Sequence, residues 1–126
     1  MNLVMKPYWP LLLLLLVTAG CGTSLPPTAD SAKARAALQT ALDAWQKGEP
    51  AQSLQARSPA IHVNDFGWDN KDRLARYEIL SEQSGGQSWK AKVLLTIQYP
   101  NGAQMQHEAN YTVDTSPSLV IVREFE

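Results

Sequence analysis

Cysteine and histidine are scarce in this sequence. Its 126 residues include one cysteine, Cys21, and two histidines, His62 and His107. A lone cysteine forms no internal disulfide, so the fold has to rest on a hydrophobic core. The two histidines are far apart, and no Cys or carboxylate cluster has the spacing of metal ligands. We therefore expect no metal and no cofactor.

Clusters of positive charge are also missing. The 11 Lys and Arg residues and the 12 Asp and Glu residues are interspersed and give a net charge of −1. Binding to phosphate backbones needs clustered positive charge, so nucleic acid is not an expected partner. The sequence likewise lacks a glycine-rich phosphate loop and a serine nucleophile elbow, which disfavours the enzyme classes that these motifs mark.

An apolar run long enough to cross a membrane is absent too. Leu11 to Val17 is uninterrupted, but a spanning helix takes about 20 apolar residues. Lys6 precedes the run, and Ala19 and Gly20 follow it. This layout is typical of a signal peptide, so we expect residues 1–20 to be an export signal that is removed.

The end of the run resembles the lipobox of bacterial lipoproteins. It reads Val17-Thr18-Ala19-Gly20-Cys21, with Thr18 where that family usually has Leu. The resemblance implies that Cys21 carries a lipid, that signal peptidase II cuts before it, and that the lipid anchors the chain to a membrane. The alternative is an ordinary secreted protein with a chance cysteine.

Residues 21–29 are expected to be a flexible tether between this anchor and the domain. Pro26, Pro27 and small polar residues keep the stretch from packing. By the same resemblance, the domain faces the periplasm or the cell exterior. Gly22, rather than Asp, follows the cysteine, which implies the outer membrane in a host with two membranes.

The remaining stretch, residues 30–126, has room for one domain. Apolar residues recur at steps of three and four from Ser31 to Lys47, which predicts an amphipathic helix. Asp30 or Ser31 supplies the N-cap oxygen, and Gly48 ends the helix because glycine tolerates a left-handed exit.

Strands are expected after a short turn at residues 51–57. Residues 61–63 are interpreted as a short strand, and 64–70 as an aromatic loop rich in turn formers. Apolar residues then alternate with polar ones, which predicts the strands 73–82, 88–99, 103–114 and 119–125. The register of strand 73–82 stays open, because its apolar residues fall on both faces. Asn101-Gly102 predicts a tight hairpin turn in which both residues accept positive φ.

A helix followed by strands joined by short turns predicts an α+β fold, with one long N-terminal helix packed on a curved four-stranded antiparallel sheet. This arrangement is similar to the cystatin-like and nuclear-transport-factor-2-like (NTF2-like) folds. These folds host enzymes, binding modules and inert subunits, and the inhibitory Gln-x-Val-x-Gly hairpin of cystatins is absent. The chain also resembles small bacterial lipoproteins of unknown function in the segments Ala36-Ala37-Leu38, Ala41-Leu42-Asp43-Ala44-Trp45, Ser53-Leu54-Gln55, Arg57-Ser58-Pro59, Ile61-His62-Val63, Tyr77-Glu78-Ile79-Leu80 and Thr115-Ser116-Pro117.

One apolar sheet face offers candidates for a pocket: His107, Tyr111 and Arg123. The resemblance to NTF2-like enzymes implies that a histidine on the concave face acts as an acid or base. Such work usually needs a carboxylate that orients the imidazole, and the matching strand positions contain none. A histidine satisfied by one hydrogen bond is therefore the plainer interpretation. Arg123 either receives an anionic ligand or packs its stem while its guanidinium reaches water.

The aromatic residues of the expected loop have two interpretations. Phe66 and Trp68 either present an exposed patch to a partner or fold back over the end of the core. Trp45 and Trp89 are expected in the core, because they lie on the apolar helix stripe and the apolar strand face.

The leading hypothesis is a non-enzymatic, membrane-tethered protein of the bacterial envelope that binds another envelope protein or packs as an accessory subunit. A small-ligand pocket protein is the alternative, and an NTF2-like hydrolase or isomerase that uses His107 comes third. An open cavity at His107, with a carboxylate within hydrogen-bond reach, would favour the pocket hypotheses.

Overall fold

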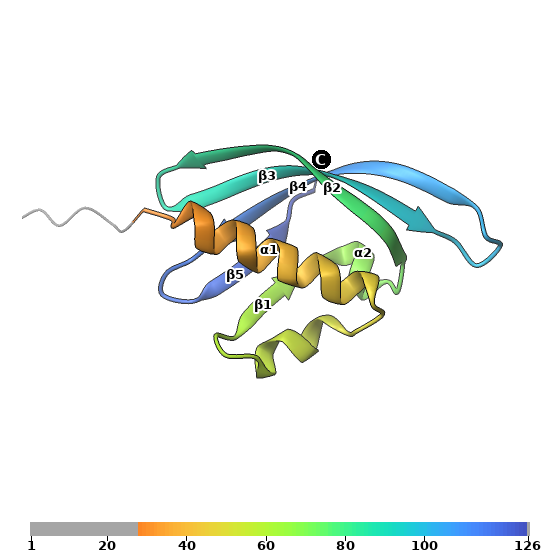
Figure 1. The fold of residues 1–126 in the computed structure, drawn as a ribbon, viewed down its shortest axis with the longest axis horizontal. Helices are drawn as coiled ribbons and strands as arrows, with labels where there is room; N and C mark the ends of the chain where they lie inside the picture. Colours follow the sequence, from red (N-terminus) through yellow and green to blue (C-terminus); the bar gives the residue numbers. More distant parts are fainter. Residues whose placement is uncertain (1–27, 126) are drawn as a thin grey trace, which may run out of the picture.

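The computed structural model describes residues 28–125 and shows one helix lying across the concave face of a curved sheet (Figure 1). The expected signal peptide, Cys21 and the tether up to Pro27 lie outside the described residues. The elements in chain order are α1 (Ser31–Gln46), η1 (Ala51–Ala56), β1 (Ile61–Asn64), α2 (Phe66–Asp69), β2 (Arg73–Gly85), β3 (Ser88–Gln98), β4 (Gln104–Asp114) and β5 (Leu119–Arg123).

Helix α1 forms where the apolar spacing predicts it, and it is one residue shorter than expected. The Asp30 carboxylate accepts a hydrogen bond from the Lys33 backbone N–H, and this N-cap satisfies a group that the helix itself leaves unpaired. The helix ends at Gln46, and Gly48 leaves it with φ +83°. Its buried face is rich in alanine, which lets the helix lie close against the sheet; the buried residues are Ala34, Ala37, Leu38, Ala41, Leu42, Ala44 and Trp45.

The sheet is mixed and five-stranded, in the order β1-β5-β4-β3-β2. The expected α+β architecture is confirmed, but the expected four antiparallel strands are wrong by one strand. The additional strand is β1, which runs parallel to β5 with Ile61 opposite Leu119. Parallel pairing needs a long connection between the two strands. Here the connection consists of α2 and the strands β2, β3 and β4. Strands that are adjacent in the sequence therefore give no indication that β1 pairs with β5.

The central hairpin, β3 and β4, has the alternation that its sequence predicts. Trp89 lies opposite Val113, and Val93 lies opposite Ala109. All four side chains are buried. Because successive residues of a strand face opposite sides of a sheet, the intervening polar residues point away from α1.

Strand β2 contains two register shifts, one between Leu74 and Arg76 and one between Ile79 and Ser81. Each shift inserts a residue and reverses the alternation of faces. Leu74 is consequently buried, and Glu82 lies on the helix side, where it pairs with Arg35 of α1. These bulges explain why apolar residues fall on both faces of the sequence pattern.

The turn between β3 and β4 differs in detail from the expected one. The Tyr99 carbonyl accepts a hydrogen bond from the Gly102 N–H at 2.8 Å. Gly102 has a positive φ of +88°, whereas Asn101 does not have positive φ. The turn is therefore a three-residue loop closed by a left-handed glycine. Asn101 contributes through its side chain, whose oxygen accepts from the Ala103 N–H at 2.9 Å.

Candidate functional site

Asp65 organises the segment that follows β1. Its Oδ1 accepts hydrogen bonds from the backbone N–H groups of Gly67, at 2.9 Å, and Trp68, at 3.3 Å. This is the geometry of an N-cap, and it starts the one-turn helix α2. The prediction of a loop over residues 64–70 is therefore wrong for its central residues, because the Asp65 cap starts a helical turn there.

The same carboxylate receives two further partners inside the domain. The Tyr111 hydroxyl donates to Oδ2 at 2.5 Å, and Arg123 Nη1 lies 3.2 Å from Oδ1. The Asp65 side chain is 1% exposed and that of Arg123 is 11% exposed. We call Asp65, Gly67, Tyr111 and Arg123 the Asp65 cluster. A buried carboxylate is tolerated when it is paired and hydrogen-bonded in this way.

Burial raises the pKa of the Tyr111 hydroxyl, and the negative charge of Asp65 raises it further. The tyrosine therefore stays protonated and keeps donating to Asp65. Each oxygen of the carboxylate is occupied by donors from the protein. The cluster is a closed network, without a free acceptor that faces solvent.

Gly67 leaves room for Arg123 where the cluster meets α2. A Cβ atom at this position would lie 2.5 Å from Arg123 Nη1 and 3.4 Å from Asp65 Oδ1. The first distance is shorter than any van der Waals contact allows, so a side chain here would displace the guanidinium. Glycine lets the arginine reach the carboxylate.

A flat stack covers the outer side of Arg123. Its guanidinium carbon lies 4.2 Å from the centre of the Phe66 ring. Phe66 in turn stacks on Phe125, with ring centres 4.9 Å apart and planes 7° apart. Such contacts between a cation and an aromatic face are favourable and exclude water from the ion pair. Phe66 remains partly exposed, and Phe125 is 85% exposed.

The structure brings together two of the three expected pocket residues. Tyr111 and Arg123 are partners across β4 and β5. His107 lies elsewhere on β4, opposite Leu95, and its Nε2 is 3.3 Å from the Tyr99 hydroxyl. Within the described residues, no hydrogen bond or ion pair joins His107 to a carboxylate. The simple interpretation of His107, as a histidine with one hydrogen-bond partner, fits this geometry.

Asp65 is not predicted as a partner of Tyr111 and Arg123, because it does not lie on any of the antiparallel strands that the sequence pattern indicates. Asp65 follows β1, which reaches the site through its parallel pairing with β5. The local signal was an aspartate before Phe66-Gly67-Trp68, which reads equally well as a turn or as an N-cap.

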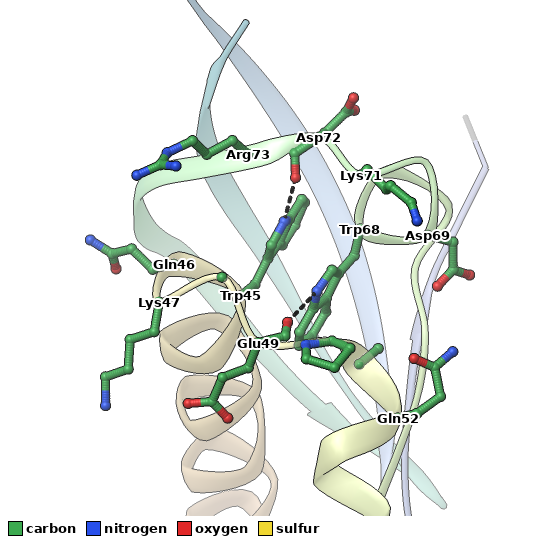
Figure 2. A pocket seen from close by; sticks show the side chains of 13 residues that line it. Trp45, Gln46, Lys47, Glu49, Gln52, Trp68, Asp69, Lys71, Asp72 and Arg73 are labelled. Atoms are coloured by element: carbon green, nitrogen blue, oxygen red, sulfur yellow. Dashed lines mark hydrogen bonds between the residues drawn. The ribbon is translucent and has the colours of Figure 1, made fainter. Parts of the chain in front are cut away.

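An open groove lies beside the cluster, at the C-terminal end of α1. Its volume is about 740 Å³, and Figure 2 shows its lining side chains. We call it the indole groove, because Trp45 and Trp68 stack at its floor with ring centres 5.5 Å apart and planes 8° apart. The lining residues are Trp45, Gln46, Lys47, Gly48, Glu49, Pro50, Ala51, Gln52, Trp68, Asp69, Lys71, Asp72 and Arg73.

Both indole N–H groups are used inside the protein. Trp45 Nε1 donates to the Asp72 carbonyl at 2.7 Å, and Trp68 Nε1 donates to the Glu49 carbonyl at 3.0 Å. Trp45 is 3% exposed and Trp68 is 7% exposed. Of the two interpretations of Trp68, the structure bears out the one in which it folds back over the core.

Within residues 28–125, no three His, Cys, Asp or Glu side chains gather as a metal site would require. No helix in that range is long and apolar enough to cross a membrane.

No protein-family model matches the chain. No curated protein matches it significantly either. Among solved structures, AclR from Streptomyces galilaeus, a proposed hydroxylase, is similar with a TM-score of 0.50 and 11% identity, over 75% of this chain and 79% of that chain. This similarity concerns the fold alone.

Two further solved structures match with lower TM-scores. The Δ5-3-ketosteroid isomerase from Mycobacterium sp. has a TM-score of 0.46 and 17% identity, over 74% of this chain and 92% of that chain. An NTF2-like protein of unknown function from Burkholderia pseudomallei has a TM-score of 0.47 and 8% identity, over 74% and 90% of the two chains. The Burkholderia protein is described as NTF2-like, which is one of the two folds named from the sequence.

Proposed function

We propose that the chain is a membrane-tethered lipoprotein of the bacterial envelope whose α+β domain is a non-catalytic module that binds another envelope protein. The observation that carries this proposal is the position of the indole groove relative to the start of the domain. The Ala29 N–H donates to the Gly86 carbonyl at 3.2 Å, and the Asp30 N–H donates to Thr115 Oγ1 at 3.1 Å. The chain therefore enters the domain at the N-terminal end of α1.

The indole groove lies at the opposite end of the same helix, since Trp45, Gln46 and Lys47 are among its lining residues. Because α1 has 16 residues, the two ends are about 24 Å apart. A lipid on Cys21 would attach the domain to the membrane through the tether at the N-terminal end of α1, so the attachment point and the groove lie at opposite ends of the helix. This separation leaves the groove accessible to a partner from the surrounding compartment.

The closed Asp65 cluster supports a non-catalytic role. A general base needs a free acceptor within reach of the substrate proton. The oxygens of Asp65 accept from Tyr111, Arg123 and the start of α2, and the carboxylate is 1% exposed. An enzyme that uses His107 is disfavoured by the same criterion, because the described partner of the imidazole is a tyrosine hydroxyl.

A small-ligand protein is the second candidate, and the size of the indole groove favours it. Small-molecule sites measure about 300 to 1,000 Å³, and the groove of about 740 Å³ falls in this range. Such sites usually bury most of the ligand against apolar side chains. The rim of this groove is mainly charged or amide-bearing, which fits a polar protein surface better.

Membrane tethering is tested by the Cys21→Ser variant in a bacterial host with two membranes. The wild-type chain should fractionate with membranes and carry the mass of a lipid, whereas the variant should remain unlipidated and uncut by signal peptidase II. An unchanged mature mass, apart from the substitution itself, would refute the anchor.

Partner binding is tested by placing a photo-crosslinking amino acid at Gln52, on the groove rim, and in a control at Gln104, on β4. Both side chains are exposed. A discrete adduct with one envelope protein is expected from Gln52 and not from Gln104. Equal adducts from both positions, or none from either, would contradict a binding role for the groove.

A further inference from the structure

Met105 is the single methionine of residues 28–125, and it is unusually open to solvent. It is 53% exposed, whereas methionine is a residue that proteins usually bury. His107 follows two positions further along β4. Because successive residues of a strand point to opposite faces, the thioether and the imidazole lie on the same face of the sheet.

Both side chains approach one atom, the hydroxyl oxygen of Tyr99. This oxygen lies 4.0 Å from Met105 Sδ and 3.3 Å from His107 Nε2. Methionine is unbranched and has three rotatable bonds, so a small rotation brings its sulfur towards the imidazole. We call Tyr99, Met105 and His107 the hairpin site, because all three belong to the β3–β4 hairpin and its turn.

The floor of the hairpin site is apolar. In the pairing of β3 with β4, Leu95 lies opposite His107 and Ile97 lies opposite Met105. Both of these β3 side chains are buried, and directly opposite residues are neighbours on one face of a sheet. An apolar surrounding limits the access of water to a bound ion. The exposed thioether leaves a path for the ion from solvent.

The two donor atoms have a distinct chemical preference. A thioether sulfur and an imidazole nitrogen are neutral, and neither is a hard oxygen donor. Thioether ligands select monovalent copper, and imidazole suits copper as well. Structural and catalytic zinc is bound by thiolate, imidazole and carboxylate, and calcium and magnesium are bound by oxygen. The pair therefore matches Cu(I) better than the common divalent ions.

The surroundings of His107 agree with this preference. In the part of the chain that the structure describes, no hydrogen bond or ion pair joins its ring to a carboxylate. The sequence predicts no metal because its histidines lack Cys and carboxylate partners, and Met105 supplies a partner of another kind. Groups of three His, Cys, Asp or Glu side chains are absent from residues 28–125, but methionine is not one of these residue types.

We infer that the hairpin site binds a Cu(I) ion through Met105 Sδ and His107 Nε2. Cu(I) has a filled d shell and accepts low coordination numbers, so a pair of donors can hold it. The ion takes the Nε2 lone pair of the neutral imidazole, and the Tyr99 hydroxyl then turns away from that nitrogen. This inference is independent of the indole groove and of the proposed binding role.

The first experiment follows the two histidine rings by NMR. It uses the full chain carrying Cys21→Ser, purified in mild detergent, because the sulfur of Cys21 would compete for a soft ion. The probe is Ag(I), which shares the ligand preference of Cu(I) without its redox chemistry. The ring signals of His107 should move on addition of Ag(I). Those of His62, which is exposed on β1, should stay in place, and equal movement of both rings would overturn the inference.

The second experiment measures Cu(I) affinity without oxygen, in competition with a coloured Cu(I) chelator. Met105→Leu and His107→Gln should each weaken binding at least about tenfold, because loss of a direct ligand costs no less than loss of a group behind one. Leucine has nearly the volume of methionine, and the position is exposed, so the fold should be retained. His62→Gln is the matched control and should leave the affinity unchanged.

X-ray absorption at the copper edge identifies the ligands. The spectrum of the chain with Cys21→Ser should contain sulfur and nitrogen in the first coordination sphere, and the sulfur contribution should disappear when Met105→Leu is added. Persistence of the sulfur would assign the ion to Met1 or Met5 and overturn the inference.

Two further outcomes would also overturn the Cu(I) site. One is a chain with Met105→Leu that binds Cu(I) as tightly as the chain with methionine, while circular dichroism shows the same fold for both. The other is displacement of Ag(I) from His107 by an equal concentration of Zn(II), since a thioether does not favour zinc. Neither outcome changes the crosslinking test at Gln52, which concerns the proposed function alone.

Discussion

The Tyr111 hydroxyl donates to the buried Asp65 carboxylate at 2.5 Å, across 46 positions of sequence. This bond joins the C-terminal half of β4 to the connection between β1 and α2. Arg123 reaches the same carboxylate from β5, so one side chain unites three parts of the domain.

Tyr111→Phe should lower the free energy of unfolding by about 1–3 kcal/mol, because it leaves a buried carboxylate oxygen without its donor. Urea denaturation monitored by circular dichroism measures this change. Tyr99→Phe is the matched control, since it removes a partly buried hydroxyl whose described partners are His107 and Met105. It should cost less than Tyr111→Phe, and equal losses would argue against a special role for the Asp65 cluster.

Gly67→Ala should destabilise the domain by about 1–3 kcal/mol, as overpacking does. The added Cβ would meet Arg123 Nη1 at 2.5 Å. Gly85→Ala is a suitable control, because a Cβ there has no neighbour within 4 Å. The decisive measurement is a double-mutant cycle with Arg123→Leu, in which Gly67→Ala should cost clearly less. If the two effects simply add, Gly67 does not act through Arg123.

Stability should fall at alkaline pH through Tyr77. Burial and a hydrogen bond to Asp43 raise the pKa of Tyr77 from 10.0 to about 12. A raised pKa in the folded state favours the protonated form, so this stabilisation is complete below pH 10 and is lost as the pH rises towards 12. Unfolding measured across this window should show a smaller pH dependence in Tyr77→Phe and in Asp43→Asn. An unchanged slope in both variants would contradict this origin.

Lys71→Gly should stabilise the domain by about 0.5–1 kcal/mol, because Lys71 has a φ of +68° and glycine adopts positive φ without the cost borne by a side chain. The opposite change, Gly48→Ala at φ +83°, should destabilise it by a similar amount. Thermal unfolding of both variants provides the comparison. Lower stability of Lys71→Gly would show that the lysine side chain itself supports the fold.

Much of the architecture could be predicted where short-range patterns decide it. The spacing of apolar residues in α1 and the alternation in β3 and β4 are local, and Gly102 marks the hairpin by its backbone freedom. The bulges of β2 could not be predicted, because an inserted residue breaks the two-residue period on which strand prediction depends. The parallel pairing of β1 with β5 could not be predicted, because the two strands are far apart in the sequence and no local pattern records their pairing.

The candidate site was harder to predict for the same reason. Tyr111 and Arg123 were singled out from their strands, but their partner Asp65 lies after β1 and arrives only through tertiary pairing. The indole groove is assembled from the end of α1, the start of η1 and the connection that precedes β2. The groove cannot be predicted from any single stretch of sequence, although the sequence pattern does predict that Trp45 is a core residue.

The parallel pairing of β1 with β5 also constrains the order in which the domain can form. Ile61 has its sheet partner at Leu119, so β1 stays without its neighbour until β5 has become available. Asp65 acquires Arg123 at the same moment. During synthesis, which starts at the N-terminus, this edge of the sheet cannot form until nearly the whole domain has been made.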